Sequence, residues 1–320
     1  MATERLLTHY RYSKHIGKMR QILQRNIFST VKVGRAYLKQ DFIYAGCVNC
    51  RSDNFELISE SDRYGLPISK QLCKACGLLQ TYPLPNPNFL KDFYTYDYRK
   101  LYAGANSPKK FEKLYAEQIS RGQKLIDFFS GTNLFSLRDL NIYEIGCSYG
   151  GLLQCFGENA KSVKGCDLDI AAIEFARSKN LDVEVAHLPV GPFEENTLVV
   201  LSHVLEHLPD PLMALGAIAD MLNTGDYLYI EVPGLEMLES GSYGGDFLRY
   251  IHIGHITDFT SASLDSLLTG MPYELCYIDK HIRAILRKTD DRSEKVVSDQ
   301  TYRMTRDLIL RLEDFRMGAS

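Results

Sequence analysis

The pattern of apolar and polar positions predicts alternating strands and helices from about residue 140 onward. Short apolar runs rich in β-branched residues alternate with segments whose apolar positions recur every three to four residues. This alternation is typical of a doubly wound α/β fold, in which helices cover both faces of a largely parallel sheet. The predicted strands cover residues 140–145, 162–166, 182–186, 197–202 and 226–232, and the predicted helices cover 150–157, 170–179 and 211–222.

The same pattern extends to both sides of this region. Apolar residues recur at helical spacing from Lys109 to Phe129, and we expect this helix to cover the sheet edge before the first strand. Thr260 opens another amphipathic helix, two strands near 273–279 and 281–287 end the sheet, and the tail from Asp290 to Ser320 is expected to be one charged surface helix.

The stretch NIYEIGCSYGG, residues 141–151, predicts a strand, a tight turn and a helix start. Gly146 permits a backbone angle that a side chain disfavours, and Gly150 and Gly151 let a ligand approach the first helical turn. The free N–H groups of that turn attract carboxylates and phosphates. The stretch therefore predicts a binding site for a polar, flat ligand, and an ordinary βα turn is the alternative.

The spacing of this motif separates two classes of cofactor. A dinucleotide site would read G-x-G-x-x-G, whereas this chain reads E-x-G-x-S-x-G-G from Glu144, and Asp167 closes the second strand, SVKGCD. An acid at that position can bind the two hydroxyls of a ribose. The arrangement resembles the class I S-adenosylmethionine (SAM)-dependent methyltransferases, a family with a Rossmann-like doubly wound sheet, in which the glycine-rich turn packs against the methionine portion of SAM.

The segment LSHVLEHLPDP, residues 201–211, supports the same resemblance. In these methyltransferases a strand often ends in a sequence such as H-x-L-E-H-x-x-D-P. A helix N-cap at Asp210 with Pro211 after it explains part of the match structurally. The resemblance implies that His203 lies close to the sulfonium of SAM, while Glu206 and His207 are expected to brace the loop.

Ligands of doubly wound sheets bind beyond the carboxyl ends of the strands. The candidate cofactor-binding residues at these ends are Glu144, Gly146, Ser148, Gly150, Asp167, Leu168, His187, Ser202 and His203.

Two C-x-x-C pairs precede this domain, Cys47 with Cys50 and Cys73 with Cys76. Paired knuckles of this kind fit a zinc ribbon, in which four thiolates complete a tetrahedron around a structural Zn²⁺. Disulfides are the alternative. The other cysteines lie in apolar strand or helix contexts and are expected to be buried packing residues.

The charge of the chain is unevenly distributed. Residues 1–40 hold nine Lys and Arg and one acid, Glu4, although the net charge of all 320 residues is −3. The apolar residues from Lys14 to Lys39 predict a basic amphipathic helix, which can lie on an anionic membrane, bind a polyanion or dock on its own protein. The first 30 residues lack the apolar block of a signal peptide, so we expect a cytoplasmic protein with peripheral membrane contact through this arm as an alternative.

The sequence divides into five predicted parts. They are a basic arm (1–42), a zinc-binding module (43–90), a tyrosine-rich connector with a covering helix (91–135), a methyltransferase domain (136–289) and a C-terminal helix (290–320). The tyrosines of the connector can form the floor of a substrate pocket or pack at a domain interface. They are Tyr94, Tyr96, Tyr98 and Tyr102.

Tyr250, His252, His255 and Asp258 follow the fifth predicted strand. With the motifs above, they resemble methyltransferases that carry an N-terminal zinc-binding module and act on sugars, including the C-methyltransferases of deoxysugar pathways. In those enzymes a Tyr or His and then Glu-His follow the fifth strand, and that His contacts the substrate and is implicated in proton transfer. His255 matches it, but Gly254 replaces the Glu, and the further C-terminal domain of the C-methyltransferases has no counterpart among these 320 residues.

The sequence therefore predicts methyl transfer from SAM to a sugar hydroxyl, with His255 as base, His252 or Tyr250 as orienting partners and His203 as the next candidate base. A histidine suits that role at neutral pH. The alternatives are a sugar C-methyltransferase, histidines that only cap the loop, a zinc-ribbon methyltransferase of RNA, and a cofactor-binding scaffold without catalysis. We expect no nucleic-acid partner, because the residues after the arm are net acidic.

Overall fold

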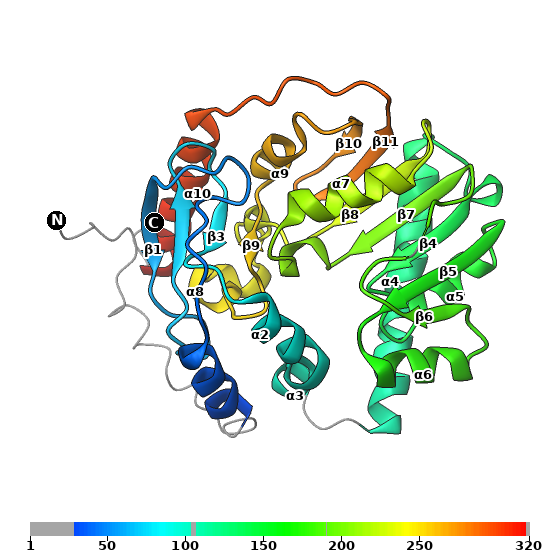
Figure 1. Ribbon diagram of the computed structural model, residues 1–320, viewed down its shortest axis with the longest axis horizontal. Coiled ribbons are helices and arrows are strands. Elements are labelled where there is room, and N and C mark those ends of the chain that lie inside the picture. Colours follow the sequence, from blue (N-terminus) through cyan, green and yellow to red (C-terminus); the bar gives the residue numbers. More distant parts are fainter. Residues whose placement is uncertain (1–28, 104–106, 190, 318–320) are drawn as a thin grey trace.

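The computed structural model describes residues 29–103, 107–189 and 191–317 (Figure 1). Within these ranges the chain forms a seven-stranded and a four-stranded sheet. The strands of the larger sheet lie in the order β10-β11-β8-β7-β4-β5-β6. Their bounds are β4 (Asn141–Ile145), β5 (Ser162–Asp167), β6 (Val183–Val185), β7 (Thr197–Ser202), β8 (Tyr227–Glu231), β10 (Tyr273–Ile278) and β11 (Arg283–Lys288).

The larger sheet confirms the predicted doubly wound α/β fold. Strands β4 to β8 pair in parallel, whereas β11 is antiparallel to both of its neighbours. Every residue of β7 is buried, because alternate side chains face opposite layers of helices. Leu198 and Val200 belong to one hydrophobic cluster, and Val199 and Leu201 belong to the other.

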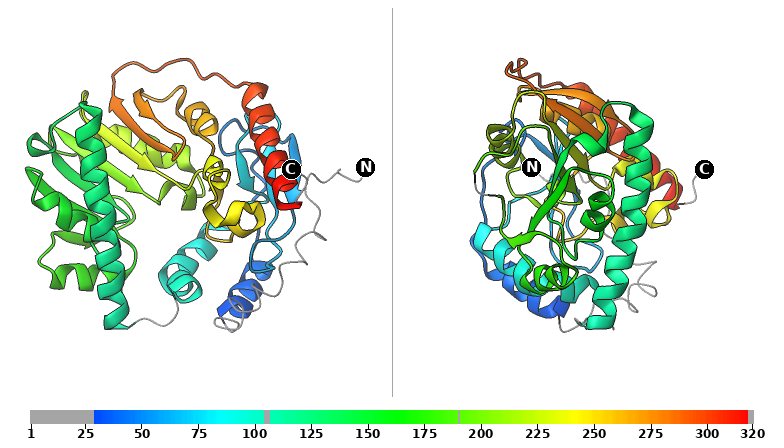
Figure 2. Two further views of the ribbon diagram at one scale, coloured as in Figure 1. Left: turned by 180° about the vertical axis from the view of Figure 1, so that it is seen from behind. Right: turned by 90° about the vertical axis from the view of Figure 1, so that its right-hand side faces the viewer.

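The helices of the first layer are α4 (Pro108–Thr132), α5 (Gly151–Gly157) and α6 (Ile170–Ser178), and those of the second layer are α7 (Pro211–Met221) and α9 (Ser261–Leu268). The predicted helix from Lys109 to Phe129 is confirmed as α4, but it covers a face of the sheet and not its edge (Figure 2). The reason is its apolar side, on which the buried ring of Phe129 packs 4.9 Å from that of Tyr229 on the inner strand β8.

The smaller sheet joins two segments that are distant in sequence. Its order is β1 (Phe55–Ser59), β2 (Lys70–Cys73), β3 (Leu79–Thr81) and β9 (Thr257–Asp258), all antiparallel. The cysteine-rich segment thus supplies three strands, and the segment that carries His252 and His255 supplies the fourth. The position of these histidines consequently depends on the cysteine-rich segment.

The connector crosses from the smaller sheet to the larger one (Figure 1). It forms α2 (Pro87–Asp92), a π-helical turn η2 (Phe93–Asp97) and α3 (Tyr98–Ala103). The structure describes residues 29–42 of the basic arm. Residues 29–39 are helical, and Val33 and Tyr37 are buried in a cluster with Ile68 of the smaller sheet's region. This part of the arm docks on its own protein, and the rest of the predicted arm lies outside the described residues.

The predicted C-terminal helix over 290–320 is found as α10 (Asp299–Met317), while residues 290–298 are not helical, and α10 is not simply a surface helix. Leu308, Ile309 and Leu312 are buried against Leu72 of β2 because one side of the helix is apolar. None of the helices in the described part of the chain is long and apolar enough to cross a membrane. The remaining short helices are η3 (Leu137–Asp139), η4 (Leu205–His207), η5 (Leu235–Leu238), η6 (Ser242–Gly245) and α8 (Phe247–Tyr250).

Candidate active site

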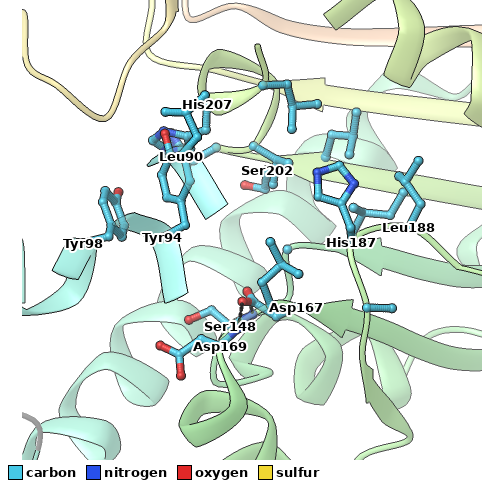
Figure 3. A pocket seen from close by; sticks show the side chains of 18 of the residues that line it. Leu90, Tyr94, Tyr98, Ser148, Asp167, Asp169, His187, Leu188, Ser202 and His207 are labelled. Atoms are coloured by element: carbon cyan, nitrogen blue, oxygen red, sulfur yellow. Dashed lines mark hydrogen bonds between the residues drawn. The ribbon is translucent and has the colours of Figure 1, made fainter. Parts of the chain in front are cut away.

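A cavity of about 510 Å³ lies between the connector helices and the carboxyl ends of β4, β5 and β7 (Figure 3). This is the edge at which ligands of doubly wound sheets bind. Seven of the predicted cofactor-binding residues line it: Gly146, Ser148, Asp167, Leu168, His187, Ser202 and His203. The other two, Glu144 and Gly150, are absent from its lining.

The conformation of the glycine-rich turn explains why Gly150 does not line the cavity. Gly146 and Gly150 both adopt left-handed backbone angles, with φ of 77° and 78°. A Cβ on Gly150 would lie 2.4 Å from Cδ1 of Leu181, on the side of α6. Gly150 therefore permits close packing at the start of α5, whereas Gly146 shapes the cavity wall.

Asp167, the last residue of β5, presents its carboxylate to the cavity beside Ser148 (Figure 3). The backbone N–H of Ser148 donates to Oδ2 and that of Asp169 donates to Oδ1, both at 2.8 Å. Two backbone donors fix the carboxylate and compensate its charge. It remains able to accept further hydrogen bonds, because each carboxylate oxygen has two lone pairs.

Glu144 lies beneath the cavity, with 1% of its surface exposed. Burial raises the pKa of Glu144 to about 8, although Arg121 opposes the shift. Arg121 and Gln118 of α4 line the cavity themselves, and Gln118 accepts the N–H of Gly151. Neither residue was among those predicted from the sequence, because polar positions on an amphipathic helix normally face solvent. Their spacing of three, on one side of the helix, was the available signal.

Three histidines surround Glu206 in what we call the histidine cluster: His203, His207 and His255. Glu206 is 1% exposed, and its Oε1 lies 3.6 Å from Nδ1 of His203 and 3.8 Å from Nε2 of His207. Burial opposes ionisation of Glu206, but His207 and His203 outweigh it and lower the pKa of Glu206 to about 2.

His207 and Tyr94 lie together at one end of the cavity (Figure 3). Nδ1 of His207 is 2.6 Å from the carbonyl oxygen of Gly254, which also accepts the Tyr94 hydroxyl at 2.6 Å. Since a carbonyl only accepts, Nδ1 must carry the proton. Tyr98 also lines the cavity, whereas Tyr96 is mostly exposed, and the side chain of Tyr102 lies outside the described residues.

The predicted catalytic residue His255 does not line the cavity. Its ring lies behind that of His207, 5.3 Å away between centroids, and packs on His252 at 3.8 Å and Tyr250 at 5.7 Å. Nδ1 of His252 accepts the N–H of Gly254, and the Tyr250 hydroxyl donates to the carbonyl of Pro233. The structure brings these three predicted residues together, but His203 is the predicted candidate that faces the cavity.

A model of the methyltransferase-domain family matches residues 112–275, which include the glycine-rich turn, Asp167 and the histidine cluster. The chain belongs to this methyltransferase family. It is a SAM-dependent methyltransferase with a Rossmann-like α/β fold. No curated protein sequence matches the chain.

Several solved structures are similar to this methyltransferase in fold. The plantazolicin methyltransferase BpumL, in complex with SAH, is 16% identical, with 62% of this chain and 94% of that chain covered and a TM-score of 0.44. CalS10, an amino pentose methyltransferase from Micromonospora echinaspora, is 13% identical, with 58% and 98% covered and a TM-score of 0.42. DesVI from Streptomyces venezuelae is 11% identical, with 58% and 100% covered and a TM-score of 0.42.

A buried ion pair links the cysteine-rich segment of the methyltransferase to the histidine cluster. Nζ of Lys70 on β2 lies 2.5 Å from Oδ2 of Asp258, with neither side chain exposed, and donates to the carbonyl of His255 at 2.7 Å. Burial opposes ionisation of Asp258, but Lys70 holds the pKa of that carboxyl below its usual range. This role could not be predicted from the sequence, because β2 and β9 are almost 190 residues apart.

The four cysteines of the two C-x-x-C pairs converge, with all four sulfur atoms within 4.8 Å of one another. Sγ of Cys47 is 3.5 Å from that of Cys76, and Sγ of Cys50 is 3.5 Å from that of Cys73. This arrangement is compatible with the predicted zinc module. Of the other cysteines, Cys276 is only partly buried.

Proposed function

We propose that this methyltransferase binds SAM in the cavity and transfers its methyl group to a hydroxyl group of a sugar. The observation that carries the cofactor assignment is the carboxylate of Asp167, which two backbone N–H groups hold at the cavity wall. A ribose offers two adjacent hydroxyl donors to such a carboxylate. Bound SAM supplies an electrophilic methyl group on a sulfonium.

The rest of the cavity fits the other parts of SAM. Its amino-acid end needs a cation for the carboxylate, and Arg121 lines the cavity with a buried Nε that has no hydrogen-bond partner among the described residues. Its adenine needs apolar and stacking surface, which Ala186, His187 and Leu188 provide after β6. The residues on the two sides of Asp167 therefore suit the amino-acid end and the adenine end of SAM.

The opposite end of the cavity supports a polyhydroxylated acceptor. Tyr94, Tyr98, His203 and His207 bring hydroxyl and imidazole groups to its wall, and these hydrogen-bond well to sugar hydroxyls. The enzyme must align the acceptor hydroxyl with the methyl carbon and remove its proton. We assign the proton acceptor to His203, because its side chain is 36% exposed while that of His255 is 5% exposed.

The decisive experiment supplies purified protein with SAM and a panel of nucleotide-linked sugars, peptides and RNA, and locates the new methyl group by NMR. We expect methylation of a sugar oxygen. A methyl group on a sugar carbon would support the C-methyltransferase alternative. Transfer to peptide or RNA alone, or cofactor binding without transfer, would refute the sugar assignment.

We also propose that Cys47, Cys50, Cys73 and Cys76 hold one structural Zn²⁺. Four thiols and no open position are typical of structural zinc sites. Lys295 lies close by, where it donates to Asn49 at 2.7 Å and to the carbonyls of Ser266 and Leu267. The positive charge of Lys295 would offset the negative charge of the four thiolates. Its hydrogen bonds connect α9 to the module.

A further inference from the structure

Glu206 lacks the partner that a buried carboxylate needs. Neither of its side-chain oxygens has a hydrogen-bond donor within the described part of the chain, although the residue is 1% exposed. Its ion-pair neighbours there are His203 and His207, at 3.6 and 3.8 Å. A buried carboxyl group whose oxygens lack hydrogen bonds is unfavourable, and a ligand bound by those oxygens would stabilise it.

The nearby Asp258 shows how this fold compensates a buried carboxylate. Asp258 is equally buried, and Lys70 supplies a permanent positive charge at 2.5 Å. Among the described residues no Lys or Arg approaches Glu206 within ion-pair distance, and its ion-pair neighbours are imidazoles. Glu206 is therefore a buried carboxyl group whose two oxygens are left for a ligand, whereas Asp258 already has its partner.

The imidazoles near Glu206 are oriented for coordination. Glu206, His207 and His255 each offer one ligating atom, and these atoms all lie within 4.8 Å of one another. Nδ1 of His255 lies 3.5 Å from Oδ1 of Asp258 and makes no hydrogen bond to the described residues. Nδ1 of His207 donates to the carbonyl of Gly254, so Nε2 is the atom left for a cation in that ring. Histidines that bind metals usually donate their other N–H to a carbonyl or a carboxylate in this way.

We propose that Glu206, His207 and His255 bind a divalent first-row transition-metal cation. Two imidazoles and a carboxylate suit Mn²⁺, Fe²⁺, Co²⁺ or Zn²⁺ better than Mg²⁺ or Ca²⁺, which prefer oxygen ligands. Three protein ligands leave coordination positions open, and His207 lines the cavity, so an open position would face the acceptor. A cation there would make a bound hydroxyl group more acidic.

The experiment titrates the full-length protein with Mn²⁺ and counts bound ions by electron paramagnetic resonance. Mn²⁺ is chosen because it binds weakly to soft thiolate sites, so zinc stays on the four cysteines. Neither SAM nor an acceptor is present, so the result is independent of whether the methyl-transfer proposal is correct. We expect one tightly bound Mn²⁺ per chain in the wild type.

Glu206→Gln keeps the shape of the side chain and removes its charge. We expect it to weaken Mn²⁺ binding by about 100-fold or more. Loss of a residue that only hydrogen-bonds to a metal ligand already lowers metal affinity by roughly 10 to 100-fold. His207→Gln, at a residue partly exposed to the cavity, should weaken binding by at least about 10-fold and serves if Glu206→Gln does not fold.

Glu236→Gln is the matched control, because Glu236 also has one buried oxygen without a partner, while Ser261 donates to its other oxygen. We expect this variant to bind Mn²⁺ as the wild type does. Absence of Mn²⁺ binding to the wild type at millimolar concentration would show that a proton compensates Glu206. That result, or full binding by both Glu206→Gln and His207→Gln, overturns the proposal.

Discussion

Asp167 and Glu206 are two carboxylates at the same edge of the sheet with opposite surroundings. Asp167 follows β5, faces the cavity and accepts two backbone N–H groups at 2.8 Å. Glu206 follows β7, is almost fully buried and accepts no hydrogen bond from the described residues. The first carboxylate is held by backbone donors and can bind a neutral ligand through hydrogen bonds, whereas the second belongs to the metal site that we propose.

This difference suggests a division of labour along the cavity. The Asp167 end suits the ribose of SAM, and the histidine cluster suits the methyl acceptor and a metal cation. The cysteine-rich segment supports the second end only, because β3 pairs with β9 and Lys70 pairs with Asp258. Damage to that segment should therefore affect the histidine cluster before it affects cofactor binding.

Cys73→Ser tests this dependence and should have the largest effect. Structural zinc contributes roughly 10 to 16 kcal/mol in small zinc-binding peptides, which is comparable to the whole stability of a typical domain, about 5 to 15 kcal/mol. We expect loss of zinc by elemental analysis and loss of hydrogen-exchange protection in β1, β2 and β3. Cys276→Ser, at a partly buried cysteine of β10, is the control and should keep both. Zinc-free wild-type protein with full protection would contradict the account.

His203→Ala compares the exposed and the buried members of the histidine cluster. We expect turnover to fall by about 10² to 10⁴-fold, the usual contribution of a positioned base, while the affinity for SAM stays close to that of the wild type. The turnover of His255→Ala should fall less, because the ring of His255 packs on that of His207 and does not line the cavity. Single-turnover rates at saturating SAM provide the measurement. Equal turnover of His203→Ala and wild type would remove His203 as the base.

Much of the fold followed from the sequence, because strands and helices leave periodic patterns that depend on near neighbours. The predicted strand 197–202 coincides with β7, and Thr260 caps α9 as expected. Long-range relations left no such pattern. The pairing of β3 with β9, the ion pair of Lys70 and the position of His255 behind His207 arise from segments that meet only after folding.

The candidate site shows the same limit. The glycine-rich turn and Asp167 are contiguous motifs, so the sequence indicated their side of the cavity. The contribution of α4 could not be seen, because Gln118 and Arg121 resemble solvent-facing positions until α5 packs beside them. Burial also cannot be read from spacing, and it is burial that separates Glu206 from Asp167.

Glu144→Gln sharpens the comparison with a third carboxyl group, one that is buried and uncharged at neutral pH. Its pKa is about 8 in the folded protein and 4.5 in the unfolded chain. Below 4.5 both states bind the proton, and between 4.5 and 8 only the folded state does. The stability contributed by this proton is thus lost as the pH rises from 4.5 to 8.

In Glu144→Gln this pH dependence is absent. The difference in unfolding free energy between wild type and variant, from urea denaturation without SAM, should change by roughly 3 to 5 kcal/mol across that interval, at 1.36 kcal/mol per pKa unit. A difference that does not vary with pH would mean that Glu144 is ionised in the folded protein.

Thr260→Ala should have the smallest effect. It measures how much stability is lost when a hydrogen-bonded polar side chain is removed in the same region. The Thr260 side chain accepts the N–H of Ser263 at 3.0 Å and caps α9. Loss of such a cap costs about 1 kcal/mol, and we expect that decrease in thermal or urea denaturation. Asp265→Ala, at an exposed position of the same helix, is a comparison variant that leaves the Thr260 hydrogen bond in place. A loss of several kcal/mol on Thr260→Ala would show that the cap supports more than α9.

The division of labour between the two carboxylates is tested most directly by calorimetric titration of Asp167→Ala and Glu206→Gln with SAH and, separately, with Mn²⁺. Asp167→Ala should weaken SAH binding by about 10 to 100-fold, because hydrogen bonds to a charged group contribute roughly 1.5 to 3 kcal/mol each, and should bind Mn²⁺ normally. Glu206→Gln should lose Mn²⁺ and bind SAH normally. Normal SAH binding by Asp167→Ala, or loss of both ligands in both folded variants, would contradict the account.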